Sequence, residues 1–233
     1  MRGINWKILI VIAILVSVIL FFELSGLDIV LQDYFYNFND KRWVVDRNNR
    51  LANIIFYSGI KVVFYIFVIA LIIALTIFHK NTIVQAYKPG LVIVLISTLV
   101  VPMVVGGLKS ATNIPCPKNI SRYGGIYPHV TVLHGFPEDF QRHENIKCFP
   151  AAHASGGFSL LSLFFLFKKK RNKKIVIYFS LSVGWLTGLY KMLIGDHFLS
   201  HTFVSMILAW FLILIVYKLV SRYFTVDGLP DGW

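Results

Sequence analysis

Long apolar blocks separated by short polar segments dominate the chain. Six such blocks lie near residues 8–22, 53–78, 90–108, 151–167, 175–193 and 199–220. Most are roughly 17–25 residues long, and a helix of about 20 apolar residues crosses the hydrocarbon core of a bilayer. The pattern therefore predicts an all-α integral membrane protein with about six transmembrane helices in one bundle. We expect residues 1–233 to form a single membrane domain.

Composition agrees with a membrane location. Of the 233 residues, 57% are hydrophobic and 15% are charged, whereas a soluble domain carries about 25% charged residues. The formal net charge of +12 would suggest a nucleic-acid partner in a soluble protein. Here the basic residues gather between apolar blocks, above all at 168–174, so we expect no nucleic-acid partner. Such a cluster determines topology, and the alternative is a site for anionic lipid.

The distribution of Lys and Arg orients the predicted bundle. The segment 168–174 holds six Lys or Arg residues and no acidic residue, which indicates a cytoplasmic loop. With six spans, both termini and the segment 79–89 then lie in the cytoplasm. The segments 25–52, 109–150 and 194–198 lie outside. We expect an integral protein of a bacterial inner membrane, with these three segments facing the periplasm or exterior.

The outer segment 109–150 is unusually long for a connection between spans. Loops of this length are usually functional or disordered, and its many aromatic and apolar residues argue against disorder. It contains both cysteines, Cys116 and Cys148. An oxidising compartment permits a disulfide between them, and two free thiols are the alternative. A bridge would contribute roughly 3–4 kcal/mol and would tie the end of the third block to the start of the fourth.

Three outer segments carry ionisable residues next to a span, where such residues are functional candidates. They are Lys109–Pro117, Cys148–Gly157 and Lys191–His201. Taken alone, Lys109 can reach the interface on its long side chain, and His153 can simply hydrogen-bond between helices. The ordered combination of a Lys, then Pro-x-x-His, then a cation followed by two histidines supports a functional hypothesis.

That combination resembles the type-2 phosphatidic acid phosphatase superfamily, which includes lipid phosphate phosphatases. The pattern of this superfamily is Lys-x6-Arg-Pro, then Pro-Ser-Gly-His, then Arg-x5-His-x3-Asp. The resemblance covers roughly residues 90–220. The positions that match the pattern are Lys109, Pro117, Pro150, His153 and His197.

Five positions depart from the superfamily pattern. Cys116, Ala151, Ala152, Lys191 and His201 stand where the pattern has Arg, Ser, Gly, Arg and Asp. These departures leave open an inactive member that binds lipid phosphate without turnover. A transporter is disfavoured because the charged residues lie at the outer ends of the spans and not at the bilayer midplane.

The resemblance implies catalytic roles for three histidines. His197 would attack phosphorus and form a phosphohistidine, which divides one difficult displacement into two steps. His153 would protonate the leaving oxygen and then activate water or another acceptor. His201 stands at the position of the Asp that orients the nucleophile, and it follows His197 by four residues, so both share one face of a helix.

The resemblance also implies cations around the phosphate oxygens, because phosphoryl transfer depends mainly on positioning and electrostatic stabilisation. Lys109 and Lys191 supply two cations, whereas the pattern has three. Arg122 is our first candidate for the missing cation, and Arg142 is the second. The expected substrate is a lipid phosphate or pyrophosphate within the membrane, and nothing in the sequence implies an obligate protein partner.

A metal centre is the competing chemical hypothesis, because six histidines fall in the outer part of the chain. They are His129, His134, His143, His153, His197 and His201. His197 and His201 have a spacing that suits two ligands on one helix face, but no metal-binding motif supplies a third. We therefore expect no metal and no cofactor.

Overall fold

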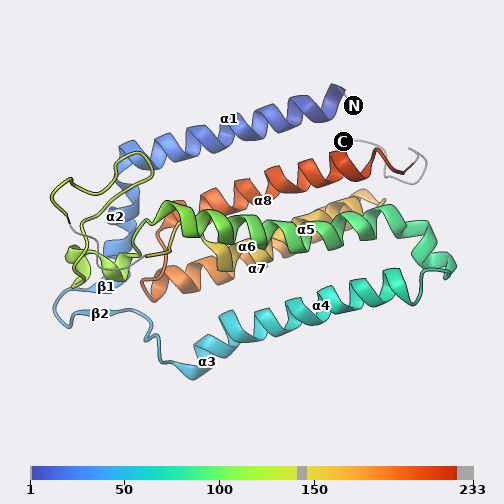
Figure 1. The fold of residues 1–233 in the computed structure, drawn as a ribbon. Helices are drawn as coiled ribbons and strands as arrows, with labels where there is room; N and C mark the ends of the chain where they lie inside the picture. Colours follow the sequence, from blue (N-terminus) through green and yellow to red (C-terminus); the bar gives the residue numbers. More distant parts are fainter. Residues whose placement is uncertain (1, 141–145, 225–233) are drawn as a thin grey trace.

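The computed structural model describes residues 2–140 and 146–224, and of residues 2 and 3 only the backbone. The described chain is a bundle of long helices that run the length of the molecule (Figure 1). Five stretches are long and apolar enough to cross a membrane. They are α1 (Arg2–Ser25), α3 (Arg50–Asn53) with η1 (Ile54–Ser58) and α4 (Gly59–Thr76), α5 (Thr82–Thr112), α7 (Lys170–Leu193) and α8 (Leu199–Val220).

The predicted fourth span is present as a shorter element. It consists of α6 (Ala152–Ser159) and the 3₁₀-helix η4 (Leu160–Phe165). A 3₁₀-helix rises about 2.0 Å per residue against about 1.5 Å in an α-helix, so these 14 residues span about 24 Å. The structure thus confirms an all-α membrane protein, with five long helices and one short helical element in place of six equal ones.

The limits of the third span differ from the prediction. Its apolar block covers 90–108, but α5 begins at Thr82 and ends at Thr112. The segment 79–89, which we expected to be a loop, therefore belongs largely to the helix. Asn81 explains the early start, since its side chain accepts hydrogen bonds from the N–H groups of Ile83 and Val84 and so caps the helix.

The short element α6 lies at the centre of the bundle. It packs against α5, α7 and α8, and Phe158 on α6 is fully buried. Glycine permits the close approach to α7, because a Cβ on Gly157 would lie 2.6 Å from the Cα of Gly184. In contrast, α1 and α4 expose apolar side chains along most of their length, as expected of helices that face lipid.

Shorter elements gather at one end of the bundle, which we call the site end. They are α2 (Leu27–Asp33), the antiparallel pair β1 (Tyr36–Asn37) and β2 (Arg42–Trp43), η2 (Pro117–Asn119) and η3 (Ser121–Tyr123). The turn between α7 and α8 lies there too, whereas the start of α1 and the end of α8 lie at the opposite end (Figure 1). The described parts of the segments 25–52, 109–150 and 194–198 therefore lie at one end of the bundle.

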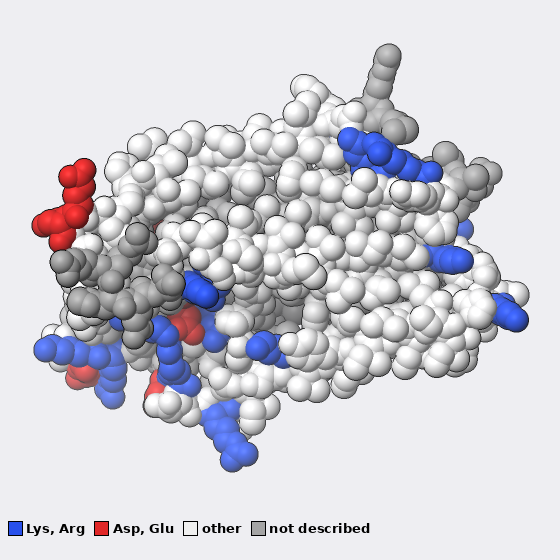
Figure 2. All heavy atoms as spheres, viewed as in Figure 1, with Lys and Arg blue, Asp and Glu red and all other residues white. Residues whose placement is uncertain are grey.

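Charge is distributed unequally between the two ends. Figure 2 shows red and blue spheres at the site end, whereas only blue spheres are visible at the opposite end. Every acidic residue in the described part of the chain lies in the range from Glu23 to Asp46, in the loop after α5 or at Asp196. The basic run 168–174 occupies the opposite end, and from the positive-inside rule we propose that this end faces the cytoplasm.

This orientation predicts the outcome of a topology assay. A reporter inserted after Lys169 should be cytoplasmic, and a reporter inserted after Gly135 in the loop at the site end should be external. Enzymatic activity of a paired phosphatase and fluorescent reporter would measure both positions. Two reporters on the same side would contradict the arrangement of spans.

Candidate functional site

The turn between α7 and α8 carries the third predicted motif. The N–H groups of Asp196 and His197 both donate to the Lys191 carbonyl, at 2.7 and 3.3 Å, which satisfies a carbonyl at the end of α7. Gly195 has a φ of 73°, and a Cβ there would lie 2.2 Å from the ring of Trp43. Only glycine fits this position, and the resulting turn buries His197, whose side chain is about 1% exposed.

Three histidines from two helices and this turn meet in one place. The Nδ1 atoms of His197 and His201 are 3.4 Å apart, and the ring centroids of His197 and His153 are 6.1 Å apart. Burial, followed by the charges of neighbours that include Lys109 and Lys191, holds the pKa of His197 well below its ordinary value. The ring is therefore neutral near pH 7. Its Nε2 atom is buried and has no hydrogen-bond partner among the described residues.

Asp196 organises the cations beside this group. Its carboxylate accepts hydrogen bonds from Lys118 at 2.9 Å and from Lys191 at 3.1 Å, and it also pairs with Arg47. Burial alone would raise the pKa of Asp196, but the hydrogen bond from Lys118 and the charges of Lys191, Lys118 and Arg47 hold it below the usual value. Lys109 acts on the same group electrostatically. Four cations thus surround one carboxylate.

Tyr57 is a site residue that no sequence motif contains. It lies in the π-helix η1, a form of helix that is frequent at functional sites. Its ring centroid is 4.0 Å from the Nζ atom of Lys191 and 4.9 Å from the ring centroid of His153. Its hydroxyl accepts a hydrogen bond from Lys61 at 2.9 Å. The α3–α4 span therefore contributes one wall of the site.

The segment before α6 joins the second motif to the third. The N–H group of Ala151 donates to the His201 carbonyl at 3.2 Å, and the Thr112 hydroxyl donates to the Phe149 carbonyl. Cys116 and Cys148 form a disulfide, with Cα atoms 5.2 Å apart. The backbone of Cys148 also hydrogen-bonds to the His201 ring. The disulfide expected from the sequence is thus present, and it holds the Cys148 backbone that binds the His201 ring.

The structure brings Lys109, His153, Lys191, His197 and His201 together, as the motif pattern predicted. It places Arg122 differently. The Arg122 guanidinium forms two hydrogen bonds with the Asp33 carboxylate, at 2.8 and 2.5 Å, so the prediction that it supplies the missing cation of the site is not supported. Lys118 and Arg47 are the further cations next to Asp196. Arg142 and His143 lie outside the described residues.

Two further histidines of the outer loop, His129 and His134, make ring contacts with other residues. The His134 ring is 2.7 Å from the Glu23 carboxylate, and the His129 ring packs on Phe198. Within the part of the chain that the structure describes, no group of three or more His, Cys, Asp or Glu residues is arranged to hold a metal ion.

Comparison with known proteins agrees with this arrangement of motifs. A family model described as the PAP2 superfamily matches residues 90–224, which is more than half of the chain. The chain belongs to the PAP2 superfamily. No curated protein and no solved structure matches it at a significant level. The match covers α5 to α8 and so includes all five motif residues that meet in the site.

Membership in the PAP2 superfamily indicates phosphatase or phosphotransferase activity on phosphate lipids. It also agrees with the helical membrane architecture. The part of the chain that precedes the match contributes Arg47, from the turn before α3, and Tyr57, from η1, to the site. No residue of the N-terminal segment was predicted to belong to the site, because the motif pattern begins only in α5.

Proposed function

We propose that this PAP2 protein is a metal-independent lipid phosphatase or phosphotransferase that acts on a phosphate or pyrophosphate headgroup through a phosphohistidine on His197. The observation that supports this most is the state of the His197 ring. Its Nε2 atom is buried without a partner among the described residues, beside a cluster of cations. An imidazole nitrogen without a proton in such a setting is a nucleophile for an anionic phosphorus centre.

The neighbouring ring fixes which nitrogen of His197 is the nucleophile. His201 is bonded to the backbone of Cys148. If one ring nitrogen donates to that carbonyl, the other is an acceptor, because a neutral imidazole carries a single N–H. The acceptor would then be the Nδ1 atom that lies 3.4 Å from the His197 Nδ1. His197 would donate through Nδ1, which leaves the lone pair of Nε2 free for attack.

His153 is placed to handle the proton of the leaving group. The ring centroids of His153 and His197 are 6.1 Å apart, so both rings are near enough to act on one phosphoryl group bound beside them. In the first step Nε2 of His197 bonds to phosphorus, the phosphorus–oxygen bond to the lipid breaks, and His153 gives a proton to the lipid oxygen. In the second step His153 removes a proton from water or an acceptor hydroxyl, whose oxygen displaces His197.

The cations around Asp196 would stabilise the equatorial phosphate oxygens. Lys109 and Lys191 come from the motifs. The family has an Arg where this chain has Cys116, and Lys118 supplies the missing cation instead. Asp196 holds Lys118 and Lys191 in place before substrate binds, which lowers the cost of bringing positive charges together. The first N–H groups of α6 can add further donors, since its N-cap Ala151 provides no side-chain cap.

Replacement of the two central histidines tests the reaction. In His197→Ala, release of phosphate from a panel of lipid phosphates and pyrophosphates should fall at least a thousandfold, because the nucleophile is lost. His153→Ala should be less severe for a pyrophosphate, whose leaving group needs less protonation. His79→Ala, at the opposite end of the bundle, is the matched control and should retain parental activity.

Two results would decide against the proposal. Parental activity in His197→Ala would show that His197 is not the nucleophile. Absence of turnover in the parent, together with retained binding of lipid phosphate, would favour a protein that binds phosphate lipids without catalysis. One observation favours this second function. His201 stands where the family has Asp, and a neutral His cannot balance the charge of an imidazolium.

The role of Lys118 is tested separately by phosphate affinity. Lys118→Ala should weaken competitive inhibition by inorganic phosphate roughly tenfold, because one charge-assisted hydrogen bond to the oxyanion is lost. Arg42→Ala removes an exposed cation of the same end, paired with Asp40, and should leave the inhibition constant unchanged. Equal inhibition constants in Lys118→Ala and the parent would exclude Lys118 from the phosphate site.

A further inference from the structure

The short helix α2 buries two polar side chains one turn apart. Asp28 is about 9% exposed and Gln32 about 1%. Residues four apart lie on the same face of a helix, so both point toward the same neighbours. A buried carboxylate and a buried amide are costly unless they form hydrogen bonds. The partners of these two side chains therefore indicate why the chain keeps them.

Asp28 caps the helix that carries His201. Its Oδ1 atom accepts a hydrogen bond from the N–H group of Ser200 at 2.8 Å. The residue at the N-cap of α8 is Phe198, which makes no side-chain cap, so a residue distant in sequence satisfies the free donors of this helix. Burial raises the pKa of Asp28 to about 6, and the group is mostly ionised at pH 7. The negative charge suits a helix N-terminus.

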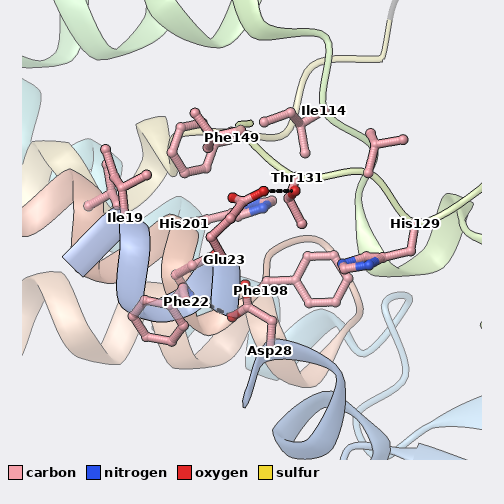
Figure 3. Close-up of a pocket in the computed structure, with 14 residues that line it drawn as sticks. Ile19, Phe22, Glu23, Asp28, Ile114, His129, Thr131, Phe149, Phe198 and His201 are labelled. Carbon is pink, nitrogen blue, oxygen red and sulfur yellow. Dashed lines mark hydrogen bonds between the residues drawn. The ribbon is translucent and has the colours of Figure 1, made fainter. Parts of the chain in front are cut away.

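Figure 3 shows this arrangement beside a small cavity. Asp28 lies against Phe198, and the ring of His201 lines the same cavity together with Glu23 and His129. The cap contact therefore lies in the first helical turn of α8, next to His201. A movement of this first helical turn would displace His201 with respect to His197.

Gln32 binds the other side of the same turn. Its Nε2 atom donates to the carbonyl of Met192 at 2.9 Å. Met192 follows Lys191 in the last turn of α7, and its carbonyl also accepts a hydrogen bond from the N–H group of Gly195 at 3.0 Å, so Gln32 binds a group that itself forms part of the turn. One face of α2 thus holds the end of α7 through Gln32 and the start of α8 through Asp28. The seven residues between Met192 and Ser200 include Asp196 and His197.

A third contact fixes α2 to the loop of the first motif. Asp33 accepts hydrogen bonds from Arg122 and, at 2.8 Å, from the hydroxyl of Tyr123. The same loop reaches the turn through the N–H group of Lys118, which donates to the Gly195 carbonyl at 3.0 Å. Arg122 therefore acts on the site through α2, although its own guanidinium is not part of the cation cluster.

We propose that Asp28 and Gln32 are positioning residues, which clamp the α7–α8 turn from both ends and so hold His197, His201 and Lys191 in register for phosphoryl transfer. The catalytic part of this statement rests on the proposed function. Neither side chain is placed to touch substrate. The clamp acts through the backbone of Met192 and Ser200, so its loss should lower the rate of the chemical step more than the affinity for substrate.

Steady-state kinetics of the purified full chain test the clamp. Asp28→Ala and Gln32→Met should each lower kcat about tenfold or more with KM changed less than about threefold, since a shift of about 1 Å in reacting groups can cost a hundredfold in rate. Asp28→Asn keeps an acceptor for the Ser200 N–H group and should recover most of the activity. Asp40→Ala removes an exposed acid of the same end and is the matched control.

A second measurement does not require turnover. The rate at which diethyl pyrocarbonate modifies His197, mapped by mass spectrometry, should be low in the parent and in Asp28→Asn, and several-fold higher in Asp28→Ala because the turn opens. Unchanged kinetics and unchanged modification in Asp28→Ala and Gln32→Met would overturn the clamp. An inactive parent in which Asp28→Ala still exposes His197 would overturn the proposed function but retain the clamp.

Discussion

The ion network around Asp196 is the interaction on which the rest of the site depends. Lys118, Lys191 and Arg47 come from three separate parts of the chain and all bind this one carboxylate. Without it, their mutual repulsion at the edge of a low-dielectric membrane would separate them. Because Asp196 precedes His197, the same network fixes His197, the proposed nucleophile, next to positive charge. The geometry of the site is therefore set before any phosphate enters.

A second constraint is the burial of polar groups in a helical bundle. Each polar side chain that enters the interior needs a partner, and these partners link elements distant in sequence. Asp28 caps α8, Gln32 binds the end of α7, and the His201 carbonyl accepts from Ala151 before α6. The disulfide between Cys116 and Cys148 adds a covalent link. The turn that carries His197 is thus held from several directions, as the proposed preorganised site requires.

The sequence was sufficient to predict the helical spans and the meeting of Lys109, His153 and His197 at one end of the bundle. Apolar block length determines spans, and the order of Lys109, His153 and His197 along alternating spans requires them to meet at one end. The helical limits of α5 were less predictable, because Asn81 caps a polar first turn that hydropathy does not detect. Tyr57 and Arg47 were missed because their role comes from packing between α3–α4 and α7. The prediction for Arg122 failed because Arg122 pairs with Asp33 at the end of α2. No local sequence pattern indicates this contact between two distant segments.

Trapping of a phosphoenzyme would show whether His197 carries the phosphoryl group during the reaction. The protein would be mixed rapidly with a lipid phosphate labelled in the phosphate, quenched in alkali, and mapped by mass spectrometry under conditions that preserve acid-labile phosphohistidine. We expect label on His197 within the first turnover, and none in His197→Ala. Label on another residue, or release of phosphate with no labelled protein at any time, would rule out His197 as the nucleophile.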